Sequence, residues 1–356
     1  MNVEEEIINW YHKYKRDLAW RKTKDPYIIW ISEIMLQQTR VEQASGYFER
    51  FTKRFPDIKT LAEASEEEVL NYWQGLGYYS RARNLHFSAK FIENELNGKF
   101  PTDYNSIIKL KGVGEYTAAA IASFAFDEKV PAIDGNVYRV LARLFNEHSD
   151  TVSADGKKVF RQIAENLIKN QNAADYNQAM MEFGALLCKP SNPLCAECPV
   201  NDVCLALKQG TIKDLPTKKK ALKLKKRYFH YIFILSNKNT LIKKRINKDI
   251  WQGLFEFPMI ETRKAINTGQ LISSEQWKKL IGKEFQLLEV STLVQHRLSH
   301  QLLHISFYTV KTDKLKENIL YKPVPIKELV DYPVPKVMEN FINSDSFANL
   351  TIKYEY

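Results

Sequence analysis

The sequence lacks the segments that mark membrane and secreted proteins. No stretch approaches the run of about eighteen uncharged residues that a membrane span needs. The N-terminus, MNVEEEIINW, is acidic, whereas a secretion signal begins basic and continues apolar. Internal repeats are also missing, and the only biased tract is lysine-rich. We therefore expect a soluble protein that works inside the cell.

Cysteine is scarce, and its placement is informative. The chain has only four cysteines, all within CKPSNPLCAECPVNDVC, at Cys188, Cys195, Cys198 and Cys204. Such clustering in an intracellular chain indicates a metal centre rather than disulfides. Four thiolates can bind a structural zinc or a [4Fe–4S] cluster. Zinc sites usually pair two C-x2-C knuckles, and this segment has one, so the spacing favours the cluster.

Length and charge set the broad class. At 356 residues the chain is too long for one ordinary core, so we expect two domains. Its formal net charge is +10. An excess of lysine and arginine suits a polyanionic partner such as nucleic acid, although charge alone does not identify one.

The spacing of apolar residues and the charge composition change near residue 210. Residues 1–210 show mostly helical spacing of apolar residues. The basic run at 211–227 is predicted to be a linker that can also follow a phosphate backbone. Residues 228–356 read as a mixed α/β or α+β domain. We predict helices over Tyr27–Phe51, Ser65–Trp73, Val137–Phe145, Lys157–Lys169, Ser274–Ile281 and Lys336–Ile342, and strands over 227–235, Thr240–Lys244 and His304–Val310.

A glycine turn in LKGVGEYTAAAI, residues 110–121, opens an alanine-rich helix. Gly112 and Gly114 permit positive φ angles, and the helix that follows leaves backbone N–H groups unpaired. With an apolar segment at Ile107–Leu110 before it, the stretch predicts a helix–hairpin–helix over about 107–121. Such an element can hold a phosphate through backbone atoms alone. A tight hairpin that binds nothing remains the alternative.

Two carboxylates stand out by their surroundings. Glu33 lies in PYIIWISEIML, a helix that is apolar on nearly every side, so burial should raise its pKa. Asp134 precedes a helix, where it can act as an N-cap and stay ionised. A protonated and a charged carboxyl together suit the breaking of a glycosidic bond. The alternatives are a buried ion pair for Glu33 and a structural cap for Asp134.

Six motifs resemble, in order, those of the adenine DNA glycosylases, within the helix–hairpin–helix, iron–sulfur DNA glycosylase superfamily. They span residues 18–204 and include the four-cysteine loop. The other five read DPYIIWISEIMLQQTRVEQ, YWQGLGYYSRARNL, LKGVGEYTAAAIASFAF, AIDGNVYRVLAR and YNQAMMEFGALLC.

The resemblance implies an N-glycosyl hydrolase of base excision repair. Glu33 would protonate the departing adenine at N7. Asp134, with Asn136 close by, would stabilise the cationic sugar and help to deliver water. Tyr116 stands where related bifunctional enzymes have a lysine that forms an imine, so a monofunctional glycosylase is implied.

The same resemblance assigns contacts to double-stranded DNA carrying adenine opposite 8-oxoguanine or guanine. Ala19 replaces a proline usual in the family's entry motif, which affects only local loop stiffness. The adenine pocket would use Arg21 and Gln178. The groups that enter or grip the DNA would be Gln38, Thr39, Leu76, Tyr78, Gly112 and Gly114, with a monovalent cation at the hairpin. Ordinary interhelix packing is the alternative for Leu76 and Tyr78.

The second domain resembles the Nudix-like module that reads 8-oxoguanine, and WQGLFEFP fits an early strand of that fold. The acids that such hydrolases use to bind metal fall on Leu287 and Leu288, so nucleotide hydrolysis is not expected. The lesion-reading residues would be Leu298, Ser299 and His300. Leu298 stands where an aromatic ring is usual. His296 and His304 are expected to be packed in strands.

Other functions remain open. A thymine mismatch glycosylase, an endonuclease III-like lyase and a non-catalytic DNA-binding module share parts of this pattern. The second domain argues against a thymine mismatch glycosylase, and Tyr116 argues against a lyase. The presence of Glu33 and Asp134 argues against a non-catalytic module. From its length and lack of long tails we expect a bacterial, cytoplasmic, nucleoid-associated monomer.

Overall fold

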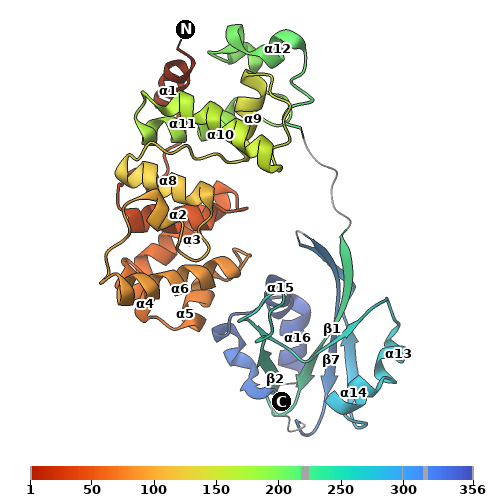
Figure 1. The fold of residues 1–356 in the computed structure, drawn as a ribbon. Helices are drawn as coiled ribbons and strands as arrows, with labels where there is room; N and C mark the ends of the chain where they lie inside the picture. Colours follow the sequence, from red (N-terminus) through yellow and green to blue (C-terminus); the bar gives the residue numbers. More distant parts are fainter. Residues whose placement is uncertain (1, 218–223, 299, 316–319, 355–356) are drawn as a thin grey trace. The chain divides into compact units, whose positions relative to one another are not determined.

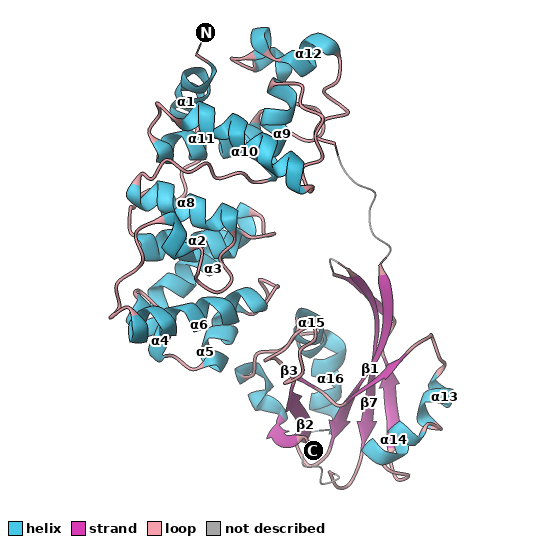
Figure 2. Cartoon of the chain, in the orientation of Figure 1, coloured by secondary structure: helices cyan, strands magenta, loops and turns pink. Residues whose placement is uncertain are grey.

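The computed structural model describes residues 2–217, 224–298, 300–315 and 320–354. The chain forms two compact units. The helical unit contains Met1–Ala64 and Arg83–Lys220, and the sheet unit contains Ser65–Ala82 and Ala221–Tyr356. Figures 1 and 2 show helices throughout the first part of the chain and strands from β1 onward. Within the described residues, no helix combines the length and the apolar character needed to cross a membrane.

In the helical unit, capping residues mark where helices begin. Asp25 caps α2, accepting a hydrogen bond from the Tyr27 backbone N–H at 2.9 Å, and Pro26 occupies the first turn, where its missing N–H costs nothing. The helices are α1 (Val3–Tyr14), α2 (Pro26–Leu36), α3 (Val41–Arg54), α4 (Ile58–Glu63), α6 (Ser80–Glu95), α7 (Tyr104–Ile107), α8 (Glu115–Phe126), α9 (Gly135–Leu144), α10 (Ala154–Ile168), α11 (Ala173–Leu186) and α12 (Leu205–Gln209), with short 3-10 turns η1 (Ala19–Arg21), η2 (Cys195–Glu197) and η3 (Asn201–Val203).

The helix predicted over Tyr27–Phe51 is broken in two. Between α2 and α3 the chain turns, and Gln38 adopts a left-handed conformation with φ 57°. A non-glycine residue with positive φ cannot continue a helix. The apolar pattern alone did not reveal this turn.

The glycine turn takes the expected place between α7 and α8. Gly112 has φ +86°, whereas Gly114 is extended with φ −97°. Only Gly112 therefore uses the conformation that both glycines permit. The preceding helix, α7, is one turn long and ends before the apolar segment does.

The sheet unit is an α/β layer structure. Its main sheet has the order β4-β1-β7-β5, with β6 also paired to β7, and β1 runs parallel to β7. One face packs on α13 and α14 through Leu271 and Trp277, and the other on α15 and α16 through Met338 and Phe347. The strands are β1 (Lys225–Leu235), β2 (Asn239–Lys244), β3 (Phe255–Glu256), β4 (Met259–Thr262), β5 (Gln286–Val290), β6 (Val294–Arg297), β7 (Gln301–Lys311) and β8 (Lys322–Pro325), and the helices are α5 (Glu66–Trp73), α13 (Thr268–Ile272), α14 (Glu275–Leu280), η4 (Ile326–Asp331), α15 (Lys336–Ile342) and α16 (Asp345–Tyr354).

The three predicted strands are confirmed as β1, β2 and β7, and the two predicted C-terminal helices as α14 and α15. The predicted linker at 211–227 is divided by the structure. Ile212 and Leu215 contact the helical unit, 218–223 lie outside the described residues, and 225–227 begin β1.

Candidate active site

One cavity of about 720 Å³ in the helical unit gathers most of the predicted catalytic residues. Its walls come from η1, the end of α2 with the turn after it, the start of α8, the start of α9, and α11. These elements are far apart in sequence, and their packing brings the two key carboxylates together. The predicted residues that line it are Arg21, Glu33, Gln38, Thr39, Tyr116, Asp134, Asn136 and Gln178.

Glu33 is a buried acid at the wall of this cavity. It lies on α2 among apolar side chains and is 5% exposed. Burial, the main cause, and the nearby charge of Asp134 raise the pKa of Glu33 to about 7, against lowering effects of Tyr116 and Arg21. Among the described residues its Oε2 has no hydrogen-bond partner. Glu33 is therefore protonated in a large fraction of molecules near neutral pH.

Asp134 is held by the start of α9. Its Oδ1 accepts from the backbone N–H groups of Asn136 and Val137, each at 2.8 Å, and its Oδ2 accepts from Asn136 Nδ2 at 2.8 Å. Burial still raises the pKa of Asp134, because desolvation outweighs these hydrogen bonds and the charge of Arg139. The helix N-terminus thus limits this upward shift without reversing it.

Tyr116 stands at the start of α8, facing both α2 and α11. Its hydroxyl donates to Met181 Sδ at 3.1 Å. Burial and then the neighbouring carboxylates raise the pKa of Tyr116 well above its ordinary value. The phenol therefore stays protonated at physiological pH.

A second buried glutamate of the cavity, Glu182, was not predicted. It is 1% exposed, and Arg16 and Arg21 both contact it through paired hydrogen bonds, with closest distances of 2.7 Å and 2.8 Å. Burial alone would raise the pKa of Glu182, but these guanidinium groups lower it to about 2. Arg21 is thus paired with Glu182 rather than with Glu33. Arg16 and Glu182 are 166 residues apart in the sequence, so no local sequence pattern could have predicted their ion pair.

Gln178 is oriented by a neighbour that sequence reasoning also missed. Tyr11 donates from its hydroxyl to Gln178 Oε1 at 2.7 Å. Because the amide oxygen is engaged in this way, the amide N–H groups remain for a ligand in the cavity.

The hairpin at Gly112 packs closely on α6. A Cβ added to Gly112 would lie 2.7 Å from the Asn84 Cβ, whereas one added to Gly114 would meet nothing within 4 Å. Ser88 Oγ donates to the Lys111 carbonyl at 3.2 Å from the same helix. Neither glycine lines the cavity described above.

The remaining predicted DNA contacts lie in the sheet unit. Leu76 is buried at 4% exposure, as interhelix packing would make it, whereas Tyr78 is 45% exposed and has φ 47°. Leu298 is partly buried against the core of the sheet unit, and His300 is exposed in the turn between β6 and β7. Ser299 lies outside the described residues.

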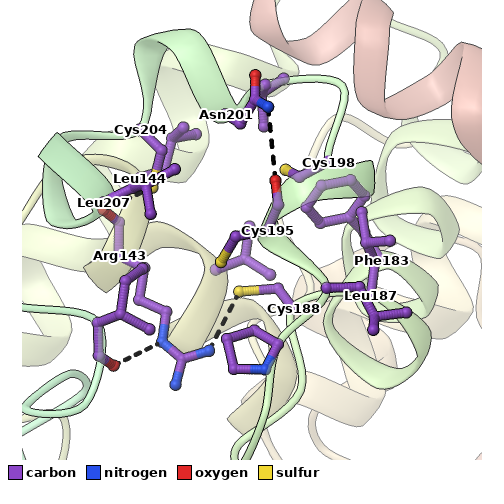
Figure 3. A pocket seen from close by; sticks show the side chains of 15 residues that line it. Arg143, Leu144, Phe183, Leu187, Cys188, Cys195, Cys198, Asn201, Cys204 and Leu207 are labelled. Atoms are coloured by element: carbon purple, nitrogen blue, oxygen red, sulfur yellow. Dashed lines mark hydrogen bonds between the residues drawn. The ribbon is translucent and has the colours of Figure 1, made fainter.

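The four cysteines converge on one small pocket of about 30 Å³ (Figure 3). The rest of its lining is mainly apolar, and Arg143 donates to Cys188 Sγ at 3.4 Å. A buried guanidinium beside four thiolates suits the net negative charge of a cysteine-ligated iron–sulfur cluster. The residues therefore fit the predicted cofactor.

Arg139 connects this loop to the cavity. Its Nε donates to the Cys188 carbonyl, and its Nη2 donates to both Asn136 Oδ1 and the Gly184 carbonyl, each at 2.8 Å. Because Asn136 in turn donates to Asp134, the cysteine loop and the carboxylate share one hydrogen-bond chain.

Sequence profiles match three parts of the chain. Residues 31–169 match the HhH-GPD superfamily of base excision DNA repair proteins, and 230–344 match the NUDIX domain. Residues 188–204 match the iron–sulfur binding domain of endonuclease III, so the cysteine loop is an iron–sulfur site. Across the described residues, no group of three His, Cys, Asp or Glu side chains is placed to hold a single metal ion.

Whole-chain relatives agree with these matches. An adenine DNA glycosylase of Buchnera aphidicola subsp. Schizaphis graminum is 34% identical over 348 residues, covering 94% of this chain and 97% of its own. The Homo sapiens adenine DNA glycosylase is 41% identical over 209 residues, covering 56% of this chain and 38% of its own. A solved thermostable thymine-DNA glycosylase is 28% identical with a TM-score of 0.54, covering 58% of this chain and 95% of its own. By this similarity along nearly its whole length, the chain belongs to the adenine DNA glycosylases, enzymes of base excision repair.

Proposed function

We propose that the enzyme removes adenine paired with 8-oxoguanine, or with guanine, from double-stranded DNA and leaves the strand intact. One observation carries the proposal: a buried acid with a pKa of about 7, Glu33, faces the same cavity as a second carboxylate, Asp134. Departure of a purine base needs a proton donor, and the sugar cation that forms needs a nearby negative charge.

The reaction follows from these two groups. The target adenine leaves the base stack and enters the cavity. Glu33 transfers its proton to N7 as the bond between the sugar C1′ and N9 breaks, and adenine departs neutral. Asp134 stabilises the cationic sugar and accepts a proton from the water whose oxygen bonds to C1′. Asn136, bound to both Asp134 and Arg139, fixes the orientation of that carboxylate.

Neighbouring groups hold the base. The Glu182 carboxylate fixes the guanidinium of Arg21, and Tyr11 turns the Gln178 amide N–H groups toward the cavity. Tyr116 cannot form an imine with the sugar, because a phenol lacks the amine that this chemistry requires. Strand cleavage by a lyase step is therefore not part of the proposed reaction.

We assign recognition of the base opposite adenine to the segment Leu298–His300 and to the exposed ring of Tyr78. The hairpin at Gly112, with a bound monovalent cation, would hold the DNA backbone. Cys188, Cys195, Cys198 and Cys204 would hold the iron–sulfur cluster, which would cross-link their loop and so order it for contact with a phosphate.

Base release on defined duplexes tests this function. The protein is incubated with adenine opposite 8-oxoguanine, guanine or thymine, and with thymine opposite guanine, and each sample is divided before treatment with alkali. We expect breaks only after alkali, fastest opposite 8-oxoguanine and absent from thymine opposite guanine. Breaks without alkali would show a lyase, and release of thymine would show that the substrate is misassigned.

A further inference from the structure

The segment 298–300, between β6 and β7, is held at both of its ends by main-chain hydrogen bonds. The Leu298 N–H donates to the Gln301 carbonyl at 2.8 Å, which closes the turn on the first residue of β7. The Lys225 N–H, at the start of β1, donates to the His300 carbonyl at 3.1 Å. β1 and β7 run side by side along their whole length (Figure 1). The position of the segment therefore depends on Gln301 and on the first residues of β1.

Gln301 is also held through its side chain, by Arg227 of β1. Arg227 Nη1 donates to Gln301 Oε1 at 3.2 Å. The same guanidinium donates to both carboxylate oxygens of Asp249, each at 2.9 Å, and to both of Glu261, at 2.7 Å and 2.8 Å. A guanidinium has five N–H donors, and these five hydrogen bonds engage all of them. Arg227, whose side chain is 11% exposed, is thus fixed by two carboxylates and holds one neutral acceptor beside the segment 298–300.

The loop that carries Asp249 packs on the same β6–β7 hairpin. Asp249 Oδ2 also accepts from Arg245 Nη2 at 3.0 Å. Two residues further on, Trp251 has φ 58°, and its ring centroid lies 5.9 Å from that of His296 on β6. Trp251 and Leu298 are both partly buried against one apolar cluster of the sheet unit. Asp249 therefore links this supporting loop to β1.

We propose that Gln301 is a positioning residue for recognition of the base opposite adenine, and that it acts through Arg227. This rests on the proposed function, which assigns that recognition to the segment 298–300. Side chains that read a base must be held to within about half an ångström, so they depend on neighbours whose own positions are fixed. Because a guanidinium carries only donors, Arg227 fixes the oxygen of the Gln301 amide, and with it the residue that closes the turn.

Gln301→Leu should lower the preference for 8-oxoguanine over guanine opposite adenine by about three- to tenfold, the size of one hydrogen bond. Leucine cannot accept from Arg227, so the start of β7 loses an anchor while Arg227 keeps both of its carboxylates. Gln301→Glu keeps an acceptor for Arg227 and should retain the preference. An effect of the added charge on DNA affinity applies to both duplexes and cancels in their ratio.

The experiment measures single-turnover adenine release by the full chain with its cluster, at protein concentrations below saturation, on duplexes with adenine opposite 8-oxoguanine and opposite guanine. The ratio of the two rates reports the preference, and the fraction of folded protein does not affect it, because one preparation serves both duplexes. Gln295→Leu is the matched control, since Gln295 is an exposed glutamine of the same hairpin and is not among the acceptors that Arg227 uses. In an Arg227→Met background, Gln301→Leu should cause no further loss. If Arg227→Met fails to fold, the two Gln301 variants carry the test.

An unchanged ratio in Gln301→Leu, or a loss that persists in the Arg227→Met background, would overturn the role of Gln301. An equal loss in Gln301→Glu would do the same, because the amide N–H groups, and not the hydrogen bond from Arg227, would then be needed. An equal loss in Gln295→Leu would show that any change in the hairpin has this effect. Failure of the proposed function looks different: the wild type itself would release no adenine, or would release it equally fast opposite both bases.

Discussion

At the scale of single residues, the cavity holds two buried glutamates in opposite states. Glu33 faces apolar side chains and another carboxylate, so its pKa rises to about 7. Glu182 faces two guanidinium groups, so its pKa falls to about 2. The same side chain therefore serves as a proton donor in one place and as a fixed anion in the other, because of what lies opposite each.

Glu182→Gln should destabilise the protein by about 3–5 kcal/mol, because it leaves two guanidinium groups at a buried site without their anion. The folded pKa of Glu182 is depressed to about 2, so its stabilisation is fully present above the unfolded pKa of about 4.3 and is lost as pH falls toward 2. Thermal unfolding of the wild type and of Glu182→Gln at several pH values measures this loss of stability.

The difference in melting temperature should be constant above about pH 5 and shrink below it. Glu42→Gln, at an exposed carboxylate of the same cavity, is the control and should change little. A Glu182→Gln protein as stable as the wild type at neutral pH would show that the cluster of charges is not stabilising.

The sequence predicted residues whose environment is local and missed those whose partners are distant. Glu33 was found because the residues of its own helix are apolar, and Asp134 because it precedes a helix. Arg16 and Glu182 were missed, because their roles depend on contacts between segments far apart in the chain.

At the scale of elements, the glycine hairpin was predicted, but its two glycines are not equivalent. Gly112 needs its positive φ and its missing side chain, whereas Gly114 needs neither. The break between α2 and α3 was not predicted, because residues 37–40, QQTR, contain no glycine or proline that would mark the turn at Gln38. Hydrophobic periodicity detects which face of a helix is buried, and it does not by itself locate a turn made by polar residues.

The substitutions Gly112→Ala and Gly114→Ala test whether the two glycines of the hairpin differ. Gly112→Ala should lose about 1–3 kcal/mol of stability and bind duplex DNA more weakly, because the methyl group meets Asn84 and the backbone cannot keep φ +86°. Gly114→Ala should change both properties little. Denaturant unfolding and a DNA-binding titration measure them, and equal effects at both positions would contradict this account of the hairpin.

At the scale of the whole molecule, composition predicted the change from helices to a mixed sheet. The basic run marked the region where the chain passes from one unit to the other. The grouping of Ser65–Ala82 with the C-terminal residues has no counterpart in the sequence pattern, because it arises from contacts such as that of Asn71 Nδ2 with the Asp331 carbonyl, 260 residues apart.

The central claim is that Glu33 is the acid that releases the base, and the rate of adenine release against pH tests it most directly. Wild type and Glu33→Gln are compared in single turnovers on a duplex with adenine opposite 8-oxoguanine, and affinity is measured separately. The wild-type rate should fall as pH rises through about 7, as Glu33 loses its proton. Glu33→Gln should lose about 10²–10⁴-fold in rate at every pH while still binding DNA. A Glu33→Gln protein with wild-type rates, or a wild-type rate unchanged through pH 7, would contradict the account.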